Sequence, residues 1–277
     1  MQTKRLPRVL AIHDLCVFGR CSLSAVISVL SARGAQCCPL PAALFSAPAN
    51  YEGGTALSLA GELPRVVSHL RGMGTRFDAV YTGFLAGEAQ AGFAEEVLDA
   101  FPDALAVVDP VLGDRGKLYR AVDETMAAAM VRLAGKARII TPNVTEAAIL
   151  LGLPPGSAPR DEADAVKWLN ALAADGSRAA VLTGLSFDRD GQIAVGWAGG
   201  DGAGLFCHPR AGGDYPGTGD LFASYMLAEL LYGAPLPAAA EAAAGFVAGC
   251  AAVTAARGAE VKEGLLFEEV LRNKPNR

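Results

Sequence analysis

The sequence predicts an α/β fold, in which a central and mostly parallel sheet lies between layers of helices. Six short apolar runs alternate with longer segments whose apolar residues recur near helical spacing, and this alternation is typical of parallel strands joined by crossover helices. Some runs, such as residues 104–108, are apolar throughout, which is typical of strands covered on both faces. Because no linker or internal repeat interrupts the 277 residues, we expect one domain over residues 1–277.

The expected elements follow one another along the chain. Strands are expected at residues 8–12, 38–45, 77–82, 104–110, 137–143 and 178–184, and the helices between them include 21–34, 87–101 and 161–176. Two alternating runs, 191–198 and 202–210, are separated by a glycine-rich turn, which predicts a hairpin at a sheet edge. Two further helices should follow, one after Gly219 and one over 236–258 that ends at Gly258.

The composition indicates a folded chain and argues against two classes of partner. Hydrophobic residues make up 52% and charged residues 19%, which favours a buried core over disorder. The 24 Lys and Arg are balanced by 29 Asp and Glu without a run of like charge, so we expect no nucleic-acid partner. The apolar segment 242–256 is shorter than the roughly 20 residues of a membrane span, and the start has no signal-peptide core. With six cysteines and no CxxC pair, we expect reduced thiols in a cytoplasmic protein without a membrane partner.

Polar residues are expected where each parallel strand ends. In open parallel sheets, ligands bind beyond the carboxyl ends of the strands, where loops lead into helix N-termini. One edge of the sheet should therefore carry a set of candidate site residues, which are His13, Asp14, Ser46, Gly83, Phe84, Asp109, Asn143, Glu146, Thr183 and Gly184.

The segment DYPGTGDLFAS, residues 214–224, places two glycines and a threonine directly before Asp220 and an apolar helical run. Gly217 and Gly219 allow a tight turn that exposes successive N–H groups, and a helix that starts there adds partial positive charge. A carboxylate beside such an anion cradle repels phosphate, unless it takes the proton of a hydroxyl that attacks that phosphate. The pattern therefore indicates phosphoryl transfer. The structural alternative is a first-turn acid stabilised by the helix dipole.

Four segments occur in an order that resembles the ribokinase superfamily, and more narrowly the pyridoxal and pyridoxamine kinases of vitamin B6 salvage. They are RVLAIHDLCVFGRCSLS at residues 8–24, DPVLGD at 109–114, TPNVTEA at 141–147 and GTGD at 217–220. The resemblance runs from about residue 8 to about residue 271, nearly the whole chain. It implies a ribokinase-like three-layer α/β/α sandwich and no Walker A motif, GxxxxGK[ST], which the sequence indeed lacks.

The same resemblance implies the activity and its cofactors. The protein would be an ATP- and Mg²⁺-dependent kinase, a homodimer, that phosphorylates the 5′-hydroxymethyl group of pyridoxal, pyridoxamine or pyridoxine; activation by K⁺ stays open. The nearest alternatives are a kinase of another hydroxymethyl heterocycle, such as hydroxymethylpyrimidine, or of a sugar. A third is a protein that binds vitamers without catalysis, because residues 45–54 carry Pro48 and Ala49 where many pyridoxal kinases have a histidine and a threonine.

The resemblance also implies roles for residues on the nucleotide side. Asp220 would be the catalytic base, with Gly217, Thr218 and Gly219 as the anion hole. The remaining assignments are Asn143 and Glu146 for magnesium and the triphosphate, Thr183 and Gly184 for phosphates, Asp109 and Asp114 near the metal and the γ-phosphate, and Tyr119 in a lid at 115–120. Read structurally, Asn143 or Thr145 could be the N-cap of a helix with Glu146 as an acid in its first turn. Asp109 could cap a turn, and 115–120 could be a surface turn.

A pyridine ring requires a flat apolar slot with a few polar groups at its edge. Phe45 and Phe84 could supply ring faces, and Cys16 and Val17 a wall, with Ser46 at the end of the second strand. Asp14 could pair with the ring nitrogen through a charge-assisted hydrogen bond. His13 could contact the substrate or bond backbone groups near the sheet, and both phenylalanines could be ordinary core.

Overall fold

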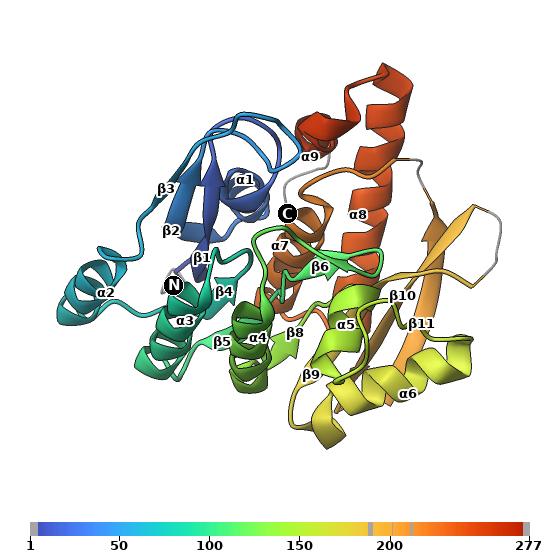
Figure 1. Ribbon diagram of the computed structural model, residues 1–277, viewed down its shortest axis with the longest axis horizontal. Coiled ribbons are helices and arrows are strands. Elements are labelled where there is room, and N and C mark those ends of the chain that lie inside the picture. The colour runs from blue at the N-terminus through green and yellow to red at the C-terminus, as the bar shows by residue number, and fades with distance from the viewer. Residues whose placement is uncertain (1–4, 188–190, 201, 211–212, 274–277) are drawn as a thin grey trace.

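The computed structural model describes residues 5–187, 191–200, 202–210 and 213–273. Within these ranges, nine strands form one sheet in the order β11-β10-β9-β8-β5-β4-β1-β2-β3 (Figure 1). The strands are β1 Arg8–Cys16, β2 Gln36–Phe45, β3 Ala56–Ser58, β4 Ala79–Thr82, β5 Leu105–Val108, β8 Ile139–Ile140, β9 Ala179–Leu185, β10 Gln192–Gly199 and β11 Gly202–Pro209. A separate two-stranded ribbon pairs β6 Gly113–Asp114 with β7 Lys117–Leu118.

The pairing is parallel through the centre of the sheet and antiparallel at both edges. β1 pairs in parallel with β2 and β4, and the parallel ladder continues through β5 and β8 to β9. The hairpin of β10 and β11 closes one edge, and the short β3 closes the other. The predicted α/β class, parallel sheet and edge hairpin are confirmed.

Helices cover both faces of the sheet, which gives three layers (Figure 1). One face is covered by α2 Leu63–Gly72, α3 Glu88–Ala100, α4 Glu124–Lys136, α5 Val144–Leu150 and α6 Glu162–Leu172. The other face is covered by α1 Ser22–Ala32, α7 Thr218–Leu231, α8 Leu236–Arg257 and α9 Phe267–Asn273. Short 3₁₀ turns lie at η1 Ala174–Gly176 and η2 Val261–Glu263.

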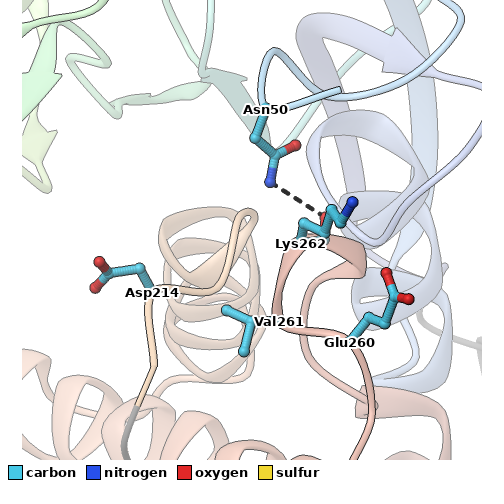
Figure 2. A pocket seen from close by; sticks show the side chains of 5 residues that line it. All are labelled: Asn50, Asp214, Glu260, Val261 and Lys262. Carbon is cyan, nitrogen blue, oxygen red and sulfur yellow. Dashed lines mark hydrogen bonds between the residues drawn. The ribbon is translucent and has the colours of Figure 1, made fainter. Parts of the chain in front are cut away.

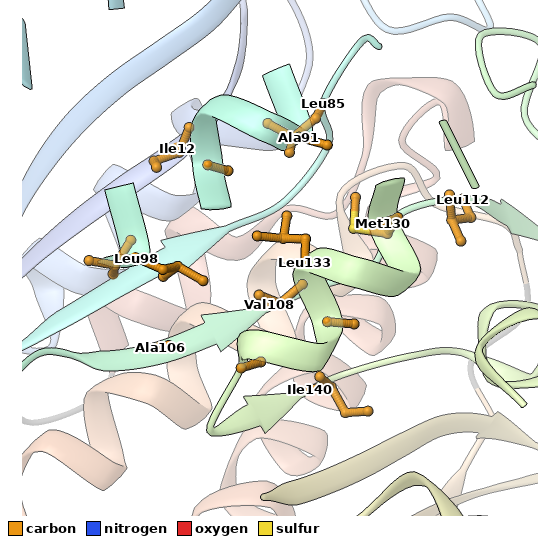
Figure 3. Packing of buried hydrophobic residues seen from close by; sticks show 14 of the residues in the cluster. Ile12, Leu85, Ala91, Leu98, Ala106, Val108, Leu112, Met130, Leu133 and Ile140 are labelled. Atoms are coloured by element: carbon orange, nitrogen blue, oxygen red, sulfur yellow. The ribbon is translucent and has the colours of Figure 1, made fainter. Parts of the chain in front are cut away.

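Alternate residues of each central strand enter opposite cores. Leu10 and Ile12 of β1 belong to the cluster beneath α3 and α4, whereas Val9 and Ala11 belong to the cluster beneath α1 and α7. Figure 3 shows part of the first cluster, which includes Ile12, Val108 and Ile140 of three strands and Leu133 of α4. Each such side chain contributes about 1.5–3 kcal/mol through burial, so both faces must be apolar. This two-sided burial explains why the strands are continuous apolar runs.

Several predicted boundaries were wrong, and each error moves candidate residues into a strand or helix. β1 extends to Cys16, so His13 and Asp14 lie within the strand rather than after it, with an irregularity in its pairing to β2 between them. α7 begins at Thr218, two residues earlier than the predicted start after Gly219. β9 contains Thr183 and Gly184, as the strand expected at 178–184 did. Polar side chains are compatible with a strand where they lie at its ligand-facing end.

The late apolar helix α8 has the predicted bounds, because it runs over Leu236–Arg257 and ends at Gly258. α8 has 22 residues, and it is the described helix whose length and mean hydropathy of 1.5 over its most apolar window would suffice to cross a membrane. One face of α8, including Phe246 and Cys250, is buried in the core beside α7. The core helix of a globular protein meets the same length and hydropathy criteria, so α8 does not by itself indicate a membrane protein.

Candidate active site

The backbone ladder extends past the strand ends and holds the candidate residues side by side. The amide of Asp109 donates to the carbonyl of Thr82 at 2.9 Å, one strand away. The amide of Thr183 donates to the carbonyl of Pro142 at 2.9 Å, and Asn143 forms a parallel bridge with Thr183. The nucleotide-side candidates from β5, β8 and β9 are thus brought together at one edge, as the sequence predicted.

The loop before α7 is shaped by Gly217. This residue is the N-cap of α7 with φ +80°, a left-handed conformation that favours glycine. A Cβ on Gly217 would lie 2.2 Å from the carbonyl oxygen of Arg20, so both conformation and space require glycine. The first intrahelical bond of α7 runs from Leu221 N to Gly217 O. The preceding amides of Thr218, Gly219 and Asp220 come before this bond, so they are available as anion donors.

Thr218 and Gly219 differ in how they can serve an anion. The hydroxyl of Thr218 donates to the carbonyl of Tyr215 at 2.7 Å, so it shapes the loop while its amide faces the helix start. Gly219 is exposed, and a Cβ there would lie 3.3 Å from Asp109 Oδ2. The segment 217–219, which we call the anion loop, is therefore adjacent to Asp109.

Asp220 lies between the N-termini of two helices. It belongs to the first turn of α7, and its Oδ2 accepts a 2.7 Å hydrogen bond from the amide of Ser22, the first residue of α1. Ser22 has φ +54°, a conformation that is costly for a residue with a Cβ and is often found at functional sites. The carboxylate is held by backbone, and its side chain remains 13% exposed, so its oxygens are accessible to a reactant.

Two more carboxylates lie close to Asp220. Burial and then the charge of Asp220 raise the pKa of Asp109 to about 8. Burial and then the charge of Asp109 raise the pKa of Glu146 well above its ordinary value. Asp109 and Glu146 are 5% and 3% exposed, so solvent screens their repulsion poorly. A cation bound among them would relieve this repulsion.

Asn143 is the N-cap of α5 and Glu146 lies in its first turn, so the structural interpretation of this motif as a helix start is confirmed. Asn143 Oδ1 accepts from the amide of Glu146 at 3.0 Å, and Glu146 Oε2 accepts from the amide of Asn143 at 2.8 Å, which is a capping box. Glu146 Oε1 also accepts from the amide of Leu112 at 3.1 Å. These backbone bonds fix the carboxylate of Glu146, whose charge interacts with that of Asp109.

The donor set fits a magnesium ion that is completed by other ligands. Carboxylate oxygens are ligands that Mg²⁺ prefers, and Mg²⁺ commonly takes one or two of them together with water and phosphate oxygens. Asp109 and Glu146 provide two buried, mutually repelling carboxylates. In the described ranges, no group of three or more His, Cys, Asp or Glu is arranged to hold a metal alone. Asp109 and Glu146 would thus be joined by water and nucleotide oxygens.

The β6–β7 ribbon, which we call the lid ribbon because it overlaps the lid expected at residues 115–120, packs beside α5. α5 anchors it twice, because Asn143 Nδ2 donates to the carbonyl of Gly113 at 2.8 Å and Thr145 Oγ1 accepts from the amide of Gly116 at 2.8 Å. At its turn, Arg115 forms an ion pair with Asp214, which precedes the anion loop. The ribbon thus links α5 to the anion loop across the expected phosphate position.

Two predicted nucleotide residues lie in or beside the lid ribbon. Asp114 is exposed, and its Oδ1 accepts from the amide of Arg115 at 2.8 Å, so it shapes the turn of the ribbon. Tyr119 follows β7 and is 42% exposed. Partial burial and then the charge of Glu146 raise the pKa of the Tyr119 phenol, which places Tyr119 near the buried carboxylates. Gly184 lies in β9 with φ +76°, beside Thr183 on the same phosphate side.

Asp14 presents an unpartnered oxygen on the substrate side. Asp14 is 4% exposed, and its Oδ2 accepts from the thiol of Cys16 at 3.3 Å. Its Oδ1 has no hydrogen-bond partner within the residues that the structure describes, although buried carboxylate oxygens normally have one. Burial and the charge of Asp220 raise the pKa of Asp14. A cationic or N–H donor would satisfy this oxygen.

Aromatic side chains lie near this end of β1. The rings of Phe45 and Phe84 meet edge to face at 6.2 Å, and both side chains are half-buried rather than core. Val17 is 72% exposed directly after Cys16. Apolar surface exposed beside a buried carboxylate is the expected lining of a heteroaromatic slot.

The loop that replaces the expected histidine and threonine is held by contacts of its own. Ser46 Oγ accepts from the amide of Thr55 at 2.9 Å, so Ser46 closes this loop while its O–H remains able to donate. Tyr51 meets Phe18 edge to face at 5.5 Å and lies 5.1 Å from Lys262 Nζ. Buried Pro48 packs against Gly19, where a Cβ would come within 2.8 Å of the proline ring.

A cavity of about 370 Å³ lies beside the anion loop. Figure 2 shows its lining, which is Asn50, Asp214, Glu260, Val261 and Lys262. Asn50 Nδ2 donates to the carbonyl of Lys262 at 3.4 Å, which ties the loop after β2 to η2. None of Asp14, Asp109 and Asp220 lines this cavity.

Sequence reasoning missed Ser22, Thr145 and Arg115. The left-handed conformation of Ser22 and the 2.7 Å bond from its amide to Asp220 are backbone features, and a serine in a helical pattern gives no signal for them. Thr145 lies inside TPNVTEA, and Arg115 directly follows DPVLGD. Their partners, Gly116 and Asp214, are brought to them by the fold of the ribbon. Only the adjacency of Thr145 to Asn143 and Glu146 could have drawn attention to it.

The fold and the site together define a ribokinase-like kinase with an α/β/α sandwich. The model of a family described as phosphomethylpyrimidine kinase matches residues 69–264. Pyridoxal kinase PdxY of Pseudomonas savastanoi pv. phaseolicola is 31% identical over 70% of this chain and 68% of its own. A pyridoxine/pyridoxal/pyridoxamine kinase of Bordetella avium is 28% identical over 89% of this chain and 85% of its own. The chain belongs to the phosphomethylpyrimidine kinase family.

Solved structures agree with this placement. Pyridoxal kinase from Lactobacillus plantarum has a TM-score of 0.89 and 31% identity over 97% of this chain and 96% of its own. A Bacteroides thetaiotaomicron protein that was crystallised with pyridoxal has a TM-score of 0.90 and 34% identity over 97% of this chain and 96% of its own. The predicted superfamily and three-layer fold are confirmed.

Proposed function

We propose that this protein is an ATP-dependent kinase that phosphorylates the 5′-hydroxymethyl group of a vitamin B6 vitamer. The observation that carries the proposal is Asp220, a partly accessible carboxylate held by the amide of Ser22 at 2.7 Å directly beside the amides of the anion loop. A base and an anion site side by side are what phosphoryl transfer to an alcohol requires. The B6 kinases among the relatives support the choice of substrate.

The chemistry follows from this placement. Asp220 accepts the proton of the substrate hydroxyl while the oxygen attacks the γ-phosphorus, and the bond from that phosphorus to the bridging oxygen breaks to release ADP. The amides at the start of α7, among them those of Thr218 and Gly219, stabilise the charge on the transferring group. Magnesium, which Asp109 and Glu146 would help to hold, supplies positive charge to the phosphate oxygens. Thr183, Gly184 and Tyr119 contact or cover the nucleotide.

The residues near the end of β1 supply the groups that a pyridine ring requires. Asp14 Oδ1, which lacks a partner among the described residues, pairs with a protonated ring nitrogen through a charge-assisted hydrogen bond. Phe45, Phe84 and Val17 contact the ring faces, with Cys16 and Ser46 at the rim. The proposal includes a homodimer, which the family resemblance supports, and a cytoplasmic location, which the six cysteines without a CxxC pair support; activation by K⁺ stays open.

A panel of alcohols tests the proposal. Pyridoxal, pyridoxamine, pyridoxine, hydroxymethylpyrimidine and ribose are each incubated with MgATP, and ADP release and the phosphorylated product are measured. With the vitamers, we expect ADP and a 5′-phosphorylated product in equal amounts. With hydroxymethylpyrimidine and ribose, we expect little ADP. Turnover of hydroxymethylpyrimidine or ribose alone would assign a different substrate, and tight vitamer binding without ADP would indicate a binding protein.

A further inference from the structure

His13 is a buried histidine whose ring nitrogens have no hydrogen-bond partner in the part of the chain that the structure describes. It lies in β1 and is 0% exposed, and both Nδ1 and Nε2 lack a partner. One nitrogen of an imidazole always carries a proton to donate, and buried polar atoms are nearly always bonded. The sequence allowed a role for His13 in bonding backbone near the sheet, and no such bond is present in the described residues.

Asp220 is an acceptor that lies close to the ring of His13. Nδ1 of His13 lies 3.6 Å from Oδ1 of Asp220, slightly beyond hydrogen-bond length. The other oxygen, Oδ2, already accepts from the amide of Ser22 at 2.7 Å. Catalytic hydrogen bonds are often long before substrate binds and shorten in the reacting complex. Ser22 and His13 thus approach different oxygens of one carboxylate.

The surroundings of His13 hold its ring in this orientation. The ring meets Tyr81 edge to face with a centroid distance of 4.4 Å. Gly83 lies against it so closely that a Cβ there would be 2.1 Å from both Nδ1 and Cε1. The space that the ring occupies therefore exists only because residue 83 is glycine. Such packing would be unnecessary if the ring had no fixed task.

We propose that His13 is a positioning residue for the catalytic base: it donates its Nδ1–H to Oδ1 of Asp220 and fixes the carboxylate toward the substrate hydroxyl. The inference rests on the proposed function, because it assigns Asp220 the role of base. His13 would act through Asp220 and not by touching the substrate. Misplacing a reacting group by about 1 Å can cost 10²-fold in rate, so loss of this donor lowers kcat.

Two substitutions separate positioning from space filling. The amide nitrogen of His13→Asn stands at the same place along the side chain as Nδ1, so it keeps the donor but leaves a cavity. His13→Leu fills the space but removes the donor. We expect kcat to fall about 10- to 100-fold in the leucine variant and to stay within about 5-fold in the asparagine variant. The KM values for alcohol and ATP should change less than about 3-fold in both.

The reverse order of the two variants would overturn the proposal, because space filling predicts that leucine is tolerated better than asparagine. A double-mutant cycle adds a second criterion. In an Asp220→Asn background, His13→Leu should cause no further loss of the residual kcat. Independent, multiplying losses would show that His13 does not act through Asp220.

A measurement without turnover keeps this inference separate from the proposed function. The chain has 3 histidines, so ¹⁵N-imidazole NMR with labelled histidine should give few signals. We expect the His13 signals to report a protonated Nδ1 and to shift in Asp220→Asn, while those of His69 and His208 stay unchanged. An unprotonated Nδ1 would overturn the inference. If the wild type phosphorylated no vitamer, the proposed function would fail while this spectrum still decided the contact.

Discussion

Asp109 is a buried carboxyl group that lies near a second carboxyl group, Asp220. It is 5% exposed, and burial and then the charge of Asp220 raise its pKa to about 8. Such a carboxyl binds its proton more tightly in the folded chain than in the unfolded chain. The contribution of Asp109 to stability is therefore lost as the pH rises from its ordinary value of 3.8 toward 8. The ionised carboxylate of Asp109, which the proposed function requires, therefore lowers the stability of the folded chain, as is common at active sites.

The substitution Asp109→Asn should remove this pH dependence. In metal-free and nucleotide-free protein, we expect the Tm of the variant minus that of the wild type to increase between pH 5.5 and pH 8, by about 2–4 °C for each kcal/mol recovered. Thermal unfolding followed by circular dichroism at several pH values measures it. The matched control Asp103→Asn, at an exposed position, should give a difference that does not vary with pH. A flat difference for Asp109→Asn as well would refute the explanation.

At the residue scale, the sequence identified side chains better than backbone. Asp220 was predicted from the glycine turn that precedes it, and Asp109 and Glu146 were assigned through the resemblance to the ribokinase superfamily. Ser22 was not predicted, because its amide reaches Asp220 across 198 positions and its positive φ leaves no trace in the residue type. His13 was singled out, but its neighbour Asp220 could be found only from the fold.

At the scale of elements, the lid ribbon depends on its anchors in α5. The ribbon strands β6 and β7 have two residues each, too few to be stable alone. The amide of Gly116 donates to Thr145 Oγ1 at 2.8 Å, and the carbonyl of Gly113 accepts from Asn143 at 2.8 Å. The helix that presents Glu146 thus also positions the ribbon over the nucleotide side.

The substitution Thr145→Val keeps the shape of the side chain and removes the hydroxyl that anchors Gly116. Because one hydrogen bond contributes about 0.5–1.5 kcal/mol, we expect the KM for ATP to rise roughly 2- to 10-fold with kcat within about 2-fold. Steady-state kinetics with varied ATP measure this effect. The control Thr125→Val removes a hydroxyl that bonds Asp123 at 2.7 Å on α4 and should leave this KM unchanged. An unaltered KM in Thr145→Val would show that the ribbon does not contribute to nucleotide binding.

Elements that contribute to the buried core were more predictable than β3 and the lid ribbon. Strands such as β4 and β5 are recognised as continuous apolar runs because both sheet faces are buried, and helices such as α3 by their periodic apolar pattern. β3 and the lid ribbon consist of two or three residues, so no period can be recognised in them. Their formation depends on partners elsewhere in the chain, such as β2 and α5.

At the scale of the whole molecule, the parallel topology assembles the site from distant segments. β1 lies in the middle of the sheet between β2 and β4, and its carboxyl end meets the start of α7. Asp14, Asp109 and Asp220, which come from β1, the end of β5 and α7, are therefore close enough for their charges to influence one another. The sequence predicted this shared edge from strand order alone, but it could not give distances.

Turnover by Asp220→Ala is the most direct test of the account, since the proposed chemistry depends on this carboxylate as the base. The variant and the wild type are compared for kcat with a B6 vitamer and for MgATP affinity by calorimetry. We predict a loss of about 10²- to 10⁴-fold in kcat, with nucleotide affinity changed less than about 3-fold. Undiminished turnover in this variant would contradict the account.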